Sequence, residues 1–127
     1  MRIGWITAFL LVGLGGCAWL SDSQKFSVYF EPYSAVLNQQ SHDTIKAAAK
    51  FAQSHALQPI AIDGFSAPPD PKRDVEGLSA QRAETVKQAL IDDGVDPNRI
   101  VTAANGIVDP KILPDVAVRR VDINVGK

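Results

Sequence analysis

An arginine near the start of a predicted helix is the residue of this chain best suited to bind a small anion. Ser79 is a good N-cap, because its hydroxyl can accept hydrogen bonds from the free N–H groups of a first helical turn. Ala83, Val86 and Leu90 then recur at helical spacing, which buries one face. Arg82 lies one turn in, and the N–H groups at a helix start favour an anion. The pattern predicts either a carboxylate-binding corner at Arg82 or an arginine on a solvated helix face.

Length and composition restrict the chain to one modest domain. It has 127 residues, of which 46% are hydrophobic and 21% are charged, so it is globular rather than disordered. The formal net charge of −1 gives no support for binding nucleic acid by counterion release. The single cysteine excludes an internal disulfide and directs attention to the segment that contains it.

The N-terminal segment has the features of an export signal. Met1-Arg2 is positively charged, and residues 3–14 are apolar. This run is shorter than the ~20 residues that a membrane-spanning helix needs, and it fits the apolar region of a secretory signal. The segment ends in Leu14-Gly15-Gly16-Cys17, which resembles a bacterial lipobox, whose cysteine becomes the lipidated first residue of the mature protein. The alternative is a buried structural cysteine, but the small residues before Cys17 favour lipidation.

The resemblance to a lipobox implies the domain organisation and the location of the protein. We expect a lipoprotein signal peptide over 1–16, a lipidated Cys17 with a short tether over 17–24, and one domain over 25–127. Residue 18 is alanine and not aspartate, which by the sorting pattern of Gram-negative lipoproteins implies lipid anchoring in the outer membrane, facing the periplasm. The seven residues 18–24 reach at most ~25 Å, so the domain is held close to the membrane.

The rest of the chain alternates between strand and helix patterns. Strands are expected over 26–30, 59–65, 99–104 and 116–125, and helices over 40–55 and from Ser79 to a C-cap at Gly94. Two helices on one face of a single sheet is the economical way to bury these apolar stripes. The expected fold class is therefore α+β: a β-α-β-α-β-β two-layer sandwich with a mixed four-stranded sheet. In the last strand, the side that carries Arg120 and Asp122 should face solvent or a groove.

The sequence contains no pattern for catalysis, a cofactor or a metal. His42 and His55 lie 13 residues apart on the first predicted helix, which separates them by ~20 Å and prevents them from sharing a metal ion. There is no Ser/His/Asp set in a plausible order, no metal-ligand cluster and no glycine-rich phosphate loop in the domain. We therefore expect a protein that is not an enzyme and that holds no cofactor.

The stretch "GLSAQRAETVKQALIDDGVDPNRI" resembles the central signature of the OmpA C-terminal-like domain family, which includes Pal and MotB. In that family Leu-Ser-x-x-Arg-Ala opens the helix, and a Gly-Val pair and an Arg-Ile pair follow. The resemblance covers residues 26–125 and implies an OmpA-like fold that holds the diaminopimelate of peptidoglycan without a covalent bond. The matching residues are Leu78, Ser79, Arg82, Ala83, Gly94, Val95, Arg99 and Ile100.

The resemblance also implies a binding site, because diaminopimelate ends in an ammonium and a carboxylate on one carbon. In the family the signature arginine takes the carboxylate, the aspartate of a Gly-His-Thr-Asp motif takes the ammonium, and an Asn-Arg-Arg-Val motif adds an arginine to the wall. Here the first arginine is Arg82 and the wall arginine is Arg119. The Gly-His-Thr-Asp motif becomes Gly64-Phe65-Ser66-Ala67. Ser66 offers a hydroxyl, but Ala67 occupies the place of the aspartate.

Asp70 is the expected substitute for the missing aspartate. It follows Ala67 by three residues across two prolines, and a stiff loop of this kind could fold it back into the site. Asp74 and Glu76 lie close to the predicted helix start and are expected to complement its dipole instead. An unpaired ligand ammonium costs ~1–3 kcal/mol. The expected ligand-binding set is Arg82, Asp70, Arg119 and Ser66, and the alternative for Arg119 is a surface pair with its neighbour.

Two functions are compatible with these features. The first is an outer-membrane lipoprotein that tethers the membrane to the cell wall by binding the diaminopimelate stem peptide of peptidoglycan. The second is a lipid-anchored module that binds other envelope proteins and has a degenerate peptidoglycan site, which the short tether and Ala67 favour. The first depends on Arg82 being presented to a ligand at the mouth of a cleft. Neither function includes nucleic acid as a partner.

Overall fold

The computed structural model describes residues 23–66, 75–107 and 118–126. They form the expected order of elements, with one 3-10 helix, η1, before the third strand. The segment around Cys17 lies outside the described residues, and no described helix has the length and apolar character to cross a membrane. The elements are β1 (Gln24–Tyr29), α1 (Gln39–Ser54), β2 (Ile60–Ser66), α2 (Val75–Asp92), η1 (Pro97–Arg99), β3 (Ile100–Ile107) and β4 (Arg120–Val125).

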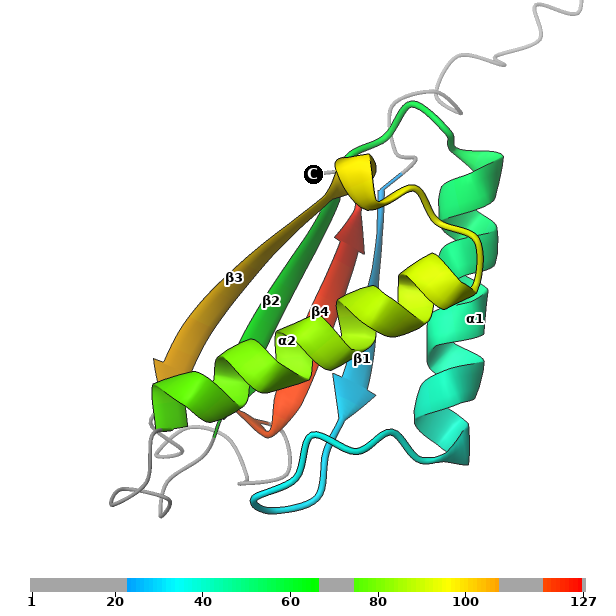
Figure 1. Ribbon diagram of the computed structural model, residues 1–127. Coiled ribbons are helices and arrows are strands. Elements are labelled where there is room, and N and C mark those ends of the chain that lie inside the picture. The colour runs from blue at the N-terminus through cyan, green and yellow to red at the C-terminus, as the bar shows by residue number, and fades with distance from the viewer. Residues whose placement is uncertain (1–22, 67–74, 108–117, 127) are drawn as a thin grey trace, which may run out of the picture.

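The four strands form one mixed sheet in the order β1-β4-β2-β3. β4 runs antiparallel to both β1 and β2, and β2 runs parallel to β3. It follows that β1 and β2 run in the same direction and that their C-terminal ends lie at the same end of the sheet. Both helices lie across one face, with α2 crossing the strands and α1 standing beside β1 (Figure 1). This arrangement confirms the expected two-layer α+β fold.

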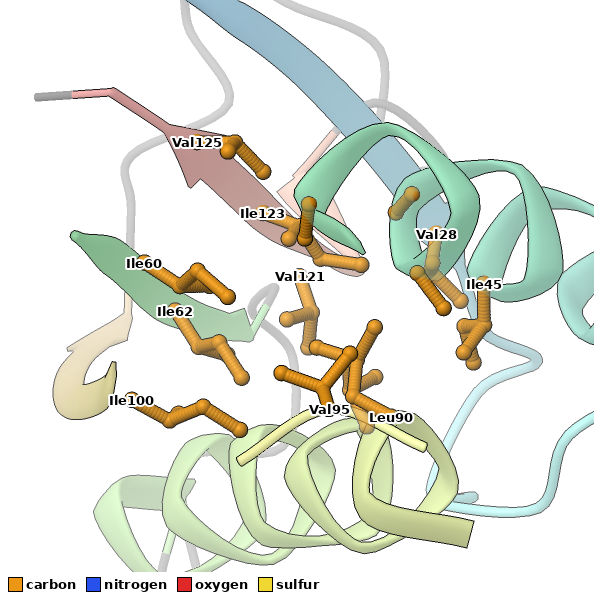
Figure 2. Close-up of a cluster of buried hydrophobic side chains, with 14 of the residues drawn as sticks. Val28, Ile45, Ile60, Ile62, Leu90, Val95, Ile100, Val121, Ile123 and Val125 are labelled. Carbon is orange, nitrogen blue, oxygen red and sulfur yellow. The ribbon is translucent and has the colours of Figure 1, made fainter. Parts of the chain in front are cut away.

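The hydrophobic core lies between the sheet and the two helices (Figure 2). Alternate residues of β2 and β4 point toward the helices and are almost completely buried, as the period of two in a strand requires. The face of α1 that meets them is rich in alanine, so the helix packs closely. The main contributors are Val28, Ile45, Ala48, Ala49, Ala52, Ile60, Ile62, Val86, Leu90, Val121, Ile123 and Val125.

Helix α2 begins earlier than expected and ends where expected. It starts at Val75, four residues before Ser79, so the expected N-cap role of Ser79 is wrong. Ser79 is instead a buried residue inside the helix, and its carbonyl oxygen faces Gly64 of β2. The helix ends in a Schellman motif, in which Gly94 has a φ of 100° and Val95 N–H donates to the Leu90 carbonyl at 3.0 Å. The predicted C-cap at Gly94 is therefore confirmed.

Strand β4 is shorter than expected because it begins at Arg120. The preceding Val118 is buried and Arg119 lies outside the strand. The face predicted to be polar carries Arg120 and Asp122 away from the helices, yet Asp122 is only 5% exposed. The carboxylate accepts a hydrogen bond from Ser27 Oγ at 2.8 Å and pairs with Arg120 Nε at 3.1 Å. These neighbours shield Asp122 from the solvent that the alternating pattern predicted for it.

Candidate functional site

The Arg82 side chain is fully buried where three segments meet. Its Nε donates to the Ser34 carbonyl at 2.8 Å and its Nη2 donates to the Glu31 carbonyl at 3.1 Å, both in the loop between β1 and α1. Its Nη1 donates to the Phe65 carbonyl at 3.1 Å, near the end of β2. The planar guanidinium therefore connects α2 to the loop and to the end of the sheet at which β1 and β2 both terminate.

Phe30 connects Arg82 with the second expected arginine. Its ring centroid lies 5.3 Å from the guanidinium carbon of Arg82, which is within cation–π range. Its carbonyl accepts from Arg119 Nε at 3.3 Å, and its N–H donates to the Arg119 carbonyl at 2.9 Å. Arg82 and Arg119 are thus brought to the same residue. Arg120 points elsewhere, since its guanidinium pairs with Asp122 and lies 4.7 Å from the Phe65 ring centroid.

The remaining expected site residues are placed only in part. Ser66 is buried at the end of β2, directly after the Phe65 carbonyl that Arg82 binds. The pairing of β2 with β3 shifts register between Gly64 and Ser66. Asp70 and Ala67 lie outside the described residues. The structure therefore gathers Arg82, Arg119 and Ser66 near one end of the sheet, and the position of an anion for the ligand ammonium stays a prediction.

The environment of Arg82 differs from the cleft mouth that the sequence pattern suggested. Because α2 begins at Val75, Arg82 is the eighth residue of the helix and does not lie at its start. The loop before α1 turns tightly here: Ser34 N–H donates to the Glu31 carbonyl at 3.2 Å, and Tyr33 adopts a φ of 59°, a region that non-glycine residues rarely occupy. This turn supplies the carbonyls that bury the guanidinium. Pro32 could have signalled the turn, but not its contact with Arg82.

Arg99, the last residue of η1, binds backbone carbonyls in the same manner at the C-terminal end of α1. Its Nη1 donates to the Ala52 carbonyl at 3.0 Å, and its Nη2 donates to the carbonyls of His55 and Gln58, each at 2.8 Å. These groups belong to the last turn of α1 and the residues after it, and α1 has no basic residue in that turn. Arg99 is therefore a structural arginine with which the role of Arg82 can be compared.

The two histidines contribute no metal site in the described part of the chain. No group of three or more His, Cys, Asp or Glu side chains among those residues is arranged to hold a metal ion. His42 is exposed near the start of α1. His55 stacks on Phe51 with ring centroids 4.1 Å apart, and its Nδ1 lies 2.8 Å from the Phe51 carbonyl.

A β1-β4-β2-β3 sheet with two helices on one face, and an arginine fixed at the carboxyl end of β2, defines the OmpA-like class of α+β domains. Comparison with known families agrees with this assignment. The chain belongs to the OmpA family, whose sequence model matches residues 29–122. Members of the family are associated with the cell envelope, face the periplasm and usually bind peptidoglycan.

Individual relatives support the same assignment. The chain is 29% identical over 82 residues to outer membrane porin F of Pseudomonas fluorescens, a match that covers 65% of this chain and 25% of the porin. It therefore spans about a quarter of that relative's length. The peptidoglycan-associated lipoprotein of Burkholderia pseudomallei is 26% identical with a TM-score of 0.71, covering 79% of this chain and 89% of that one. A periplasmic domain of Helicobacter pylori MotB is 28% identical with a TM-score of 0.67, covering 83% and 73%.

Proposed function

We propose that this protein is an outer-membrane lipoprotein whose domain binds the diaminopimelate of peptidoglycan without a covalent bond and so tethers the membrane to the cell wall. The observation that carries the proposal is Arg82, a guanidinium held in a fixed orientation at the carboxyl end of β2. Membership of the OmpA family supports it. The likeness to a peptidoglycan-associated lipoprotein that is covered over 89% of its length supports it further.

The contacts of Arg82 suggest how a carboxylate would be bound. Since the guanidinium is buried, an incoming carboxylate can reach its N–H groups only if the groups that cover Arg82 move aside. A carboxylate would add a second charge and a bidentate geometry that a single carbonyl cannot offer. Arg119, which donates to the Phe30 carbonyl, adds a second positive group to the lining of the site, and Ser66 adds a hydroxyl. Asp70 is the proposed partner of the ligand ammonium.

The topology is suited to a protein that connects two layers of the envelope. The chain enters the domain at Gln24, where β1 begins, while Arg82 binds a carbonyl near the end of β2 and carbonyls in the loop after β1. These places lie at opposite ends of the strands (Figure 1). A lipid on Cys17 would therefore hold one end of the domain near the membrane and leave the Arg82 end directed toward the wall.

The proposed ligand contact is tested by replacing Arg82. We expect Arg82→Lys to weaken co-sedimentation of the purified protein with diaminopimelate-containing murein at least tenfold, because lysine keeps the charge but loses the planar pair of donors. Murein in which lysine replaces diaminopimelate lacks the bound carboxylate, and the wild-type protein should bind it equally weakly. Free diaminopimelate should compete with diaminopimelate-containing murein for binding to the wild-type protein.

The matched control is Arg99→Lys, measured well below the melting temperature of both variants. Both substitutions remove an arginine that serves three backbone carbonyls, so each should lower stability, but only Arg82→Lys should reduce binding. Retained pull-down by Arg82→Lys and by Arg82→Ala would contradict the ligand assignment.

The lipid anchor makes a separate prediction at Cys17. Cys17→Ser removes the thiol that would carry the acyl chains, so cells producing this variant should incorporate no radiolabelled palmitate into the protein. The variant should also leave the outer-membrane fraction, since acyl chains supply the membrane affinity. Continued labelling would show that another residue is modified and would refute the assignment of Cys17.

A second candidate function is a lipid-anchored module that binds envelope proteins and has a degenerate peptidoglycan site. The burial of Arg82 against three carbonyls favours it, because these contacts give the arginine a structural role without any ligand. The replacement of the family aspartate by Ala67 favours it as well. If wild-type protein and Arg82→Lys both ignore murein while capturing the same envelope protein, this second function replaces the first.

A further inference from the structure

A groove of about 590 Å³ lies beside the Arg82 site but does not include it. One wall is a stripe of α2 that runs from Gln81 to Asp92 at helical spacing. The other wall consists of Ala35 and Leu37 in the loop before α1 and His42 in the first turn of α1. The two helices and the loop that border it are visible in Figure 1. The groove is therefore a separate feature of the surface, outside the proposed peptidoglycan-binding site.

The loop wall of this groove presents apolar side chains on a fixed backbone. Ala35 and Leu37 line it, and in the same loop, beside the groove lining, Val36 is 77% exposed and Tyr33 is 60% exposed. The loop is held by the bonds from Arg82 to its carbonyls, and Ser34 Oγ accepts from Val36 N–H at 3.0 Å. Leu37 is packed against the core on its other side. Exposed apolar groups on such a rigid frame are typical of a pre-organised protein interface.

The charges of the groove are of one sign. Glu84 and Asp92 line it, and none of its described lining residues is a lysine or an arginine. The two carboxylates are eight residues apart on α2, which places them ~12 Å apart along the helix axis. Between them lies Ala89, a small residue that allows close approach of another chain. A complementary partner needs two positive groups at this spacing with apolar side chains between them.

These features select a helix as the partner. The groove is walled by side chains of α2 and of the loop, so it offers no strand edge to which an extended peptide could add backbone hydrogen bonds. We propose that the groove binds a basic amphipathic helix of another protein, with Lys or Arg residues seven or eight positions apart and apolar residues between them. This binding is independent of the proposed attachment to peptidoglycan.

The test is selection from a displayed library of helical peptides, using the full-length protein as the target. Charged positions of the library are Lys or Glu, and the apolar positions are Leu, Phe or Ala. We expect enrichment of peptides with two Lys residues seven or eight positions apart. The double variant Glu84→Lys/Asp92→Lys changes exposed residues only, so it should stay folded, bind these peptides at least tenfold more weakly and select Glu-containing peptides instead.

The matched control is Asp43→Lys, which reverses an exposed carboxylate that accepts from Gln39 on α1 and does not line the groove, so it should leave peptide binding unchanged. Murein co-sedimentation of the double variant should equal that of the wild type. This result would distinguish peptide binding in the groove from the proposed binding of peptidoglycan. The proposal is overturned if no peptide is enriched, or if the enriched peptides bind the double variant as well as the wild type. It is also overturned if the groove variants instead abolish self-association or binding to phospholipid vesicles.

Discussion

Replacing Arg99 with alanine is expected to lower the free energy of unfolding by about 3 kcal/mol, because charged hydrogen bonds to the carbonyls of Ala52, His55 and Gln58 are lost together. For a domain of this size the melting temperature should fall by about 15 °C. Helix α1 has no basic residue in its last turn, so Arg99 supplies the positive charge that complements the C-terminal end of the helix dipole. The loss should therefore concentrate at the end of α1.

Two measurements locate this effect. Arg99→Lys should recover part of the stability, since lysine restores the charge but reaches fewer carbonyls at once. Amide hydrogen exchange in Arg99→Ala should accelerate most in the last turn of α1. A melting temperature equal to that of the wild type would mean that water replaces the arginine at no cost, and the structural role assigned to Arg99 would be wrong.

Replacing Gly64 with alanine is expected to be equally damaging. A Cβ atom at this position would overlap the carbonyl oxygen of Ser79 and lie 3.1 Å from the Ala83 side chain. Both groups belong to α2, and a backbone carbonyl inside a helix cannot rotate away. The helix has to move off the sheet, at a cost of about 3 kcal/mol. Because Arg82 follows on the same helix, its alignment with the Phe65 carbonyl should be disturbed too.

The Gly64 variant is checked by calorimetry and by murein co-sedimentation. Ala103→Val is the matched control: it also enlarges a side chain of the sheet, but on the exposed edge strand β3, where added β-branched character is nearly neutral. Gly64→Ala should lower both the melting temperature and murein binding, whereas the control should lower neither. Unchanged stability in Gly64→Ala would show that α2 does not approach β2 as closely as described.

The fold was more predictable from the sequence than the site. Periodicity identified each helix and strand, because burial of one face imposes a regular apolar spacing, as in Ile60 and Ile62 of β2. The boundaries were less accurate. Ser79 looks like a helix start on local chemistry, but the helix continues back to Val75, and tertiary packing against Gly64 determines where the serine lies. Local propensity does not contain that contact.

The contacts of the arginines were the least predictable part. Arg82 and Arg99 both bind carbonyls that are more than 15 positions away in the sequence. A backbone carbonyl is present at every residue and therefore leaves no trace in the pattern of residue types. The burial of Asp122 was missed for a similar reason, since the shielding Ser27 comes from a strand 95 residues earlier. Two signals for Arg99 were available: the Arg-Ile pair of the family resemblance and the absence of a basic residue at the end of α1.

The placement of the chain entry and of Arg82 at opposite ends of the strands has a mechanical consequence. In the proposed tether, a force that separates the membrane from the wall would stretch the domain along β1. The hydrogen bonds that join β1 to β4 over six facing residue pairs run perpendicular to the strands. A pull along the strand loads all of these bonds in shear at the same moment, whereas a pull from the side would open them one by one. The proposed tether would therefore load the domain in the direction in which this strand pairing resists tension best.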